Sequence, residues 1–103
     1  MKNYMDLTGK VALITGASSG IGAATALVFA DLGAKVAIGY HGNHTGAEKV
    51  HEQIEKSGGT AIAIRADVRA ATEIIRLIDT VTTELGPIDI LVVDHVEKTP
   101  TEN

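Results

Sequence analysis

Short apolar runs alternate along the chain with segments of helical pattern, and this alternation limits the possible fold more than any other feature of the sequence. The apolar runs, expected to be strands, are Val11–Ile14, Lys35–Gly39, Thr60–Arg65 and Ile88–Val93. The segments between them, expected to be helices, are Ile21–Leu32, Thr45–Lys56 and Ala70–Leu85. The order β-α-β-α-β-α-β predicts a parallel sheet with helical crossovers, because parallel neighbours cannot be joined by a tight turn.

The handedness of these crossovers predicts the topology. Right-handed connections place the first two helices on one face of the sheet, and the third on the other face if the fourth strand returns beside the first. The expected strand order is 3-2-1-4, a partial Rossmann fold of the doubly wound α/β class. Ile90, Leu91 and Val92 make the fourth strand apolar on both sides, which is typical of a central strand. Since no further strand follows, we expect an open edge and self-association through it.

Composition argues against several classes of function. The 103 residues carry a net charge of −4, which disfavours nucleic-acid or anionic-membrane partners, because both require a basic surface. There is no cysteine, so disulfides and thiolate metal sites are excluded. No apolar run approaches the roughly 20 residues of a membrane helix, and the first residues lack the apolar core of a signal peptide. We expect one cytoplasmic domain over residues 1–103.

The segment Thr15–Gly22, Thr-Gly-Ala-Ser-Ser-Gly-Ile-Gly, follows an expected strand and opens an expected helix, as a phosphate-binding turn requires. Gly16 permits the sharp turn, Gly20 lets the backbone approach a pyrophosphate, and Gly22 lets helix and strand pack closely. The helix N-terminus adds unpaired N–H groups and a partial positive charge. A tight turn without a ligand is the alternative. The candidate dinucleotide contacts in this turn are Gly16, Ser18, Ser19, Gly20, Ile21 and Gly22.

With this motif in place, the chain resembles the classical short-chain dehydrogenase/reductase family. Gly9–Thr15 is similar to the family's opening strand, Asp67-Val68 to the dipeptide that contacts adenine, and Ile88–Val92 to its fourth strand. The resemblance covers residues 7–92 and looks closest to 3-oxoacyl-carrier-protein reductases and glucose-dehydrogenase-like members. It implies a nicotinamide cofactor, and a parent reaction of hydride transfer between that cofactor and a carbonyl or alcohol.

Two departures from the family pattern bear on activity. The family usually carries Asn-Asn-Ala-Gly after its fourth strand, where this chain has Val93-Asp94-His95-Val96. The family's catalytic Ser and Tyr-x-x-x-Lys would lie beyond residue 103, and neither Tyr4 nor Tyr40 precedes a lysine by four positions. We therefore expect a truncated member, inactive alone, with no catalytic residue and with a non-family tail at 94–103. A non-catalytic nucleotide-binding or self-assembling module is the alternative.

The end of the second strand bears on the choice between NAD and NADP. An acid there bonds the ribose hydroxyls of NAD and repels the 2′-phosphate of NADP. This chain has Tyr40 and His41 instead, which favours NADP, and a protonated His41 could pair with the phosphate. No Arg or Lys lies in the glycine turn or directly after the strand, so NAD stays open. His41 as a solvated loop residue and Asp67 as a helix cap are the alternatives to cofactor contacts at Tyr40, His41, Asp67 and Val68.

Other residue clusters carry weaker signals. Only His44 and His51 share a helical face, and no carboxylate completes an i, i+4 pair with a second histidine, so no metal site is expected. Asp94 and His95 are adjacent, and adjacent strand residues point to opposite faces, which disfavours a catalytic dyad.

Overall fold

The computed structural model describes residues 6–94, and it contains four strands and three helices in the expected order. Each observed end lies within two residues of the expected one. The strands are β1 (Val11–Thr15), β2 (Lys35–Tyr40), β3 (Thr60–Arg65) and β4 (Ile90–Val93). The helices are α1 (Gly20–Asp31), α2 (His44–Lys56) and α3 (Ala71–Glu84).

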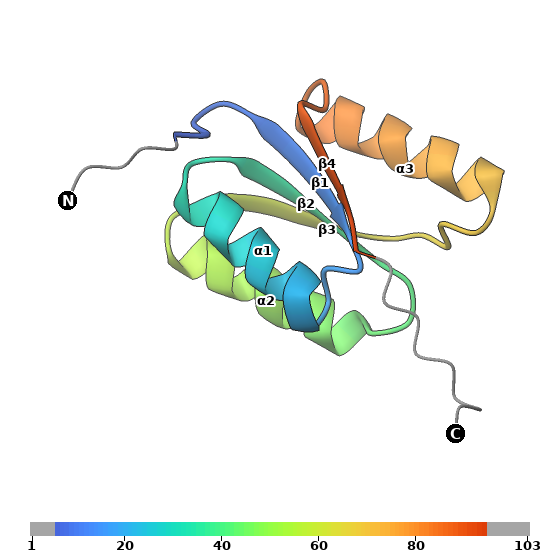
Figure 1. The fold of residues 1–103 in the computed structure, drawn as a ribbon, viewed down its shortest axis with the longest axis horizontal. Helices are drawn as coiled ribbons and strands as arrows, with labels where there is room; N and C mark the ends of the chain where they lie inside the picture. The colour runs from blue at the N-terminus through green and yellow to red at the C-terminus, as the bar shows by residue number, and fades with distance from the viewer. Residues whose placement is uncertain (1–5, 95–103) are drawn as a thin grey trace.

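The strands form one parallel sheet in the order β3-β2-β1-β4, which confirms the predicted topology. Helices α1 and α2 cover one face and α3 lies on the other (Figure 1). Ile14 of β1 is in register with Ile38 of β2 and with Val92 of β4. The carboxyl ends of β1, β2 and β3 therefore meet at one edge of the sheet, beside the loops that carry the candidate site residues.

Two apolar cores form on opposite faces of the sheet. Ile14 and Ile38 pack with Ile54 under α1 and α2, whereas Leu13 packs with Leu77 under α3. Because β1 and β2 are covered on both faces, their central segments, Val11–Ile14 and Val36–Ile38, are continuous apolar runs.

Strand β4 has the apolar pattern of a central strand but lies at the open edge of the sheet, as the expected order 3-2-1-4 requires. Within residues 6–94 it pairs with β1 alone and is an edge strand. Leu91 and Val93 are 58% and 63% exposed, while Ile90 and Val92 pack against the α1/α2 core. The strand is apolar on both faces, as expected. One face packs against α1 and α2, but α3 does not cover the other face, which carries Leu91 and Val93.

Candidate functional site

The glycine turn connects β1 to α1 through two glycines in left-handed conformations. Gly16 has a φ of +69° and Gly20 a φ of +60°, a region that residues with a Cβ rarely adopt. A Cβ built on Gly16 would overlap the carbonyl oxygen of Asp94. Only glycine therefore satisfies both the turn and the packing at this position.

Gly20 is open to solvent, whereas Gly22 is packed against Gly16, just after β1. A Cβ on Gly22 would overlap the carbonyl oxygen of Gly16, so this glycine brings α1 close to β1. A Cβ on Gly20 would meet no atom within 4 Å, so the backbone there faces open space. The open side at Gly20 can admit a phosphate group, and the packed side at Gly22 holds the helix in place.

The start of α1 offers donors to an anion. Ser19 is the N-cap residue, and its side chain makes no capping hydrogen bond, so the hydroxyl is not engaged by the helix. The first turn of α1 holds no acidic residue. The first turn of α1, which begins at Gly20, therefore offers the unpaired N–H groups and the partial positive charge that a helix end provides.

A contact from α2 to the glycine turn was not anticipated from the sequence. A Cβ on Gly46 would overlap the carbonyl oxygen of Ser18, so the first turn of α2 lies directly against the turn. Asn43 caps this helix, and its Oδ1 accepts a hydrogen bond from the Gly46 amide at 3.0 Å. In the sequence, Asn43 indicates where α2 begins, because asparagine favours the N-cap position. It does not indicate that the helix contacts the glycine turn.

Asp94 also lies against the glycine turn. Its Oδ2 is 2.9 Å from the position that a Cβ of Gly22 would take, and its backbone oxygen contacts Gly16. The departure from the family pattern at this position thus places a carboxylate beside the start of α1, where the family usually carries an asparagine.

The residues after β2 and β3 form the second part of the site. The Tyr40 hydroxyl and His44 Nδ1 are 2.9 Å apart, and Arg65 Nε donates to the His41 carbonyl at 3.1 Å. The Ala66 amide donates to the Tyr40 carbonyl at 2.8 Å. These bonds keep the two loops together at the carboxyl edge of the sheet.

Asp67 forms a compact ion pair with Arg69. Its carboxylate accepts from Arg69 Nε at 2.9 Å and Nη2 at 3.0 Å, and from the Arg69 backbone amide. His41 Nε2 lies 3.8 Å from the same carboxylate. The hydrogen bonds from the Arg69 side chain, then that from its backbone, hold the pKa of Asp67 well below its ordinary value. The alternative of a helix cap is wrong, because the N-cap residue of α3 is Ala70.

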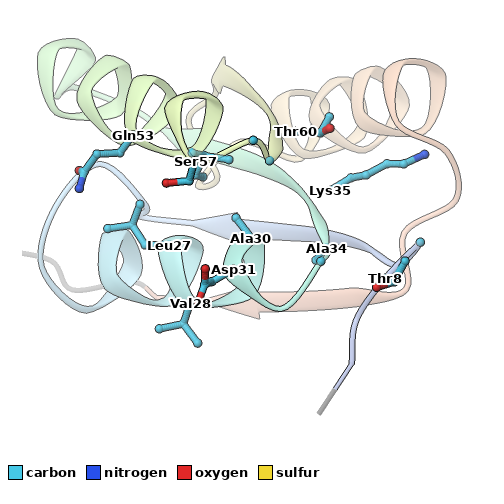
Figure 2. Close-up of a pocket in the computed structure, with 15 residues that line it drawn as sticks. Thr8, Leu27, Val28, Ala30, Asp31, Ala34, Lys35, Gln53, Ser57 and Thr60 are labelled. Atoms are coloured by element: carbon cyan, nitrogen blue, oxygen red, sulfur yellow. The ribbon is translucent and has the colours of Figure 1, made fainter. Parts of the chain in front are cut away.

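Val68 faces an apolar cavity of about 680 Å³ between α3, β1 and β4. Thr15 also lines this cavity, and its buried hydroxyl has no hydrogen-bond partner among residues 6–94. A second cavity, of about 730 Å³, lies between α1 and α2 with Leu27, Lys35 and Ser57 in its lining (Figure 2). Because it opens at the amino ends of the strands, it is separate from the glycine turn.

Thus the structure brings the expected site residues to one edge of the sheet, in two groups. The turn residues surround the start of α1, and Tyr40, His41, Asp67 and Val68 follow β2 and β3. His44 and His51 instead approach glutamates on their own helix, Glu48 and Glu55, at 3.9 and 3.6 Å. In the described part of the chain, no group of three acidic or histidine side chains could hold a metal ion. No helix there is long and apolar enough to cross a membrane.

Comparison with known proteins gives the family. The family profile described as short chain dehydrogenase matches residues 10–94. A 3-oxoacyl-[acyl-carrier-protein] reductase from Synechocystis sp. is 48% identical over 86 residues, covering 84% of this chain and 35% of the relative.

Solved structures share the fold at similar identity. A dehydrogenase/reductase from Sinorhizobium meliloti superposes with a TM-score of 0.84 at 46% identity, covering 86% of this chain and 35% of that protein. A 7α-hydroxysteroid dehydrogenase complexed with NADH and 7-oxo glycochenodeoxycholic acid gives 0.82 at 40% identity, with coverage of 88% and 36%. The chain spans about a third of the length of these relatives. On the match over residues 10–94, the chain belongs to the short-chain dehydrogenase/reductase family.

Proposed function

We propose that this chain binds a dinucleotide cofactor and forms the nucleotide-binding N-terminal portion of a short-chain dehydrogenase/reductase. The observation that carries the proposal is the open space at Gly20, directly before the unoccupied amides of the first turn of α1. A glycine turn at a helix N-terminus that leaves room for a ligand is the arrangement that holds a pyrophosphate.

Each part of the site has a proposed role. The pyrophosphate is held by Gly16, Ser18, Ser19, Gly20, Ile21 and Gly22, with the Ser19 hydroxyl as an added donor. Tyr40 and His41 adjoin the adenosine ribose, and Asp67 and Val68 adjoin the adenine. When bound, the nicotinamide cofactor supplies or accepts the hydride. The absence of a carboxylate at the end of β2 favours NADP over NAD.

The parent reaction is hydride transfer between the cofactor and a carbonyl or alcohol, and we propose that the 103-residue chain alone does not catalyse it. The family's proton-transferring tyrosine requires a lysine four residues later. Tyr40 is followed at that spacing by His44, which its hydroxyl contacts.

The test is a titration of the purified chain with NADPH and with NADH, following nicotinamide fluorescence and heat. Saturable binding by the wild-type chain is expected, and Ser19→Glu should weaken both cofactors about tenfold or more, because a carboxylate at the N-cap repels the pyrophosphate. Thr72→Glu, in the first turn of α3 on the opposite face, is the matched control and should bind like wild type. A folded wild-type chain that binds neither cofactor would contradict the proposal.

A second candidate is self-assembly through the apolar side of β4 and α3. Leu91 and Val93 are more than half exposed, and Ile74 and Ile78 of α3, which line the same cavity, are 38% and 43% exposed. Exposed apolar residues that surround a cavity beside an open strand edge favour association with another copy.

A further inference from the structure

The arginines at the carboxyl edge of the sheet differ in how their charges are offset. Arg69 is paired with Asp67, and Arg76 Nη2 lies 2.9 Å from Glu73 Oε1. Arg65 has no carboxylate within 4.0 Å among residues 6–94, and its one side-chain hydrogen bond runs from Nε to the His41 carbonyl. Arg65 is therefore a cation at this edge whose charge no neighbouring acid neutralises.

Arg65 lies next to the position where a dinucleotide fold recognises the adenosine ribose. It is the last residue of β3 and is in register with Tyr40, the last residue of β2. Paired residues of parallel strands point to the same face, and Tyr40 packs on the side of α1 and α2. The bond to the His41 carbonyl then holds the guanidinium beside the first loop residue after β2.

The charges around this position suit a phosphate better than a free hydroxyl. At the end of the second strand, an acid bonds the 2′-hydroxyl of NAD, whereas a nearby arginine accommodates the 2′-phosphate of NADP. The loop after β2 supplies no acid, and the nearest one, Asp67, is held by Arg69. With Nε on the His41 carbonyl, Arg65 retains two amino groups that match the geometry of phosphate oxygens.

We propose that Arg65 binds the 2′-phosphate of NADPH and so determines a preference for NADPH over NADH. The inference rests on the proposed function, because it concerns the ribose of the dinucleotide held at the glycine turn. The sequence suggests His41 as the residue that pairs with the 2′-phosphate. The bond to the His41 carbonyl places a second cation, Arg65, at the same position from 24 residues further along the chain.

The experiment measures the affinities of the 103-residue chain for NADPH and NADH in the wild type, Arg65→Gln, Arg65→Lys and a control, Lys35→Gln. Lys35 is exposed at the amino end of β2, so the control removes the same charge at the opposite edge of the sheet. Arg65→Gln should weaken NADPH about tenfold and NADH less than about twofold. Arg65→Lys should fall between, because it keeps the charge and loses the planar fork. Circular dichroism verifies that each variant is folded.

The outcomes separate this inference from the proposed function. A wild-type chain that prefers NADPH, and loses that preference in Arg65→Gln but not in Lys35→Gln, supports it. An equal loss of both cofactors in Arg65→Gln overturns it, because Arg65 then only supports the loop. Binding of both cofactors with no effect of Arg65→Gln overturns the inference and leaves the proposed function standing. If the folded wild-type chain binds neither cofactor, both fall.

Discussion

The carboxylate of Asp94 lies against the glycine turn on its packed side, at Gly22, and adds a negative charge near the proposed pyrophosphate site at Gly20. Its Oδ2 is close to Gly22, within the first turn of α1, and the helix end attracts this carboxylate as it would attract a phosphate. The residue that the family usually carries here, an asparagine, has the same shape without the charge. At the scale of one residue, we therefore expect the charge of Asp94 to oppose the ligand that the proposed function assigns to the turn.

Replacing Asp94 with asparagine should raise the affinity for NADH and NADPH alike, by roughly three- to tenfold. The gain comes from removing one negative charge beside the pyrophosphate, so it should shrink as salt is added. Calorimetric titration at two ionic strengths measures it. Asp31→Asn, at the far end of α1, makes the same change in net charge and should leave the affinity unaltered. Equal affinities of Asp94→Asn and wild type at low salt would show that the carboxylate does not act on the ligand.

The conformation and packing of the turn glycines could be predicted from the sequence alone, but the positions of Asp94 and Arg65 could not. The spacing of Gly16, Gly20 and Gly22 after a strand limits what each must do, and the observed conformations agree. The contact of Asp94 with Gly16 depends instead on the register of β4 against β1, which no local pattern specifies. Arg65 lies beside the end of β2 because β3 pairs with β2. It is far from the glycine turn in the sequence, so a pattern around that turn does not include it.

Helix α2 connects the two parts of the site at the scale of whole elements. Its first turn lies against Ser18 through Gly46, and it begins at His44, which contacts Tyr40. The helix itself was predictable, because Val50 and Ile54 follow the helical period and pack in the core. Its contact with the glycine turn was not, since that depends on the close approach of two segments far apart in the sequence.

Asn43→Ala should destabilise the chain by about 1 kcal/mol, because it removes the side chain that caps α2. We expect weaker binding of NADPH as well, since the uncapped turn of α2 is the part that contacts Ser18. Urea unfolding followed by circular dichroism gives the first effect and a fluorescence titration the second. Gln53→Ala, on an exposed position of the same helix, should change stability by less than about 0.5 kcal/mol. A loss of stability in Gln53→Ala as large as in Asn43→Ala would argue against a specific role of the cap.

At the scale of the whole molecule, the two faces of the sheet are unequally covered. Two helices cover one face and a single helix lies on the other (Figure 1). Leu91 and Val93 of β4 and Ile78 of α3 remain exposed on the side with the single helix. The order of the elements predicts this imbalance, because three right-handed crossovers with a return of the fourth strand place two helices on one side and one on the other.

This uneven coverage should lead to self-association, and Leu91→Lys should reduce it. Light scattering over a range of concentrations is expected to give a mass above that of one chain for the wild type, and a lower mass for the variant, because a lysine on this face opposes apolar contact. Val28→Lys is the control, since Val28 is also more than half exposed but belongs to α1 on the opposite face. A monomeric wild type at all concentrations would contradict self-association.

The position of β1 between β2 and β4 has a consequence for synthesis on the ribosome. One neighbour of β1, strand β2, follows it after a single crossover. The other neighbour, β4, comes much later: Asp89, just before β4, accepts a hydrogen bond from the Val11 amide across 78 positions of sequence. The α1/α2 core can thus form on the nascent chain while the other edge of β1 still has no partner. During translation, we therefore expect Leu13, which packs against Leu77 in the folded chain, to stay exposed until α3 and β4 have emerged.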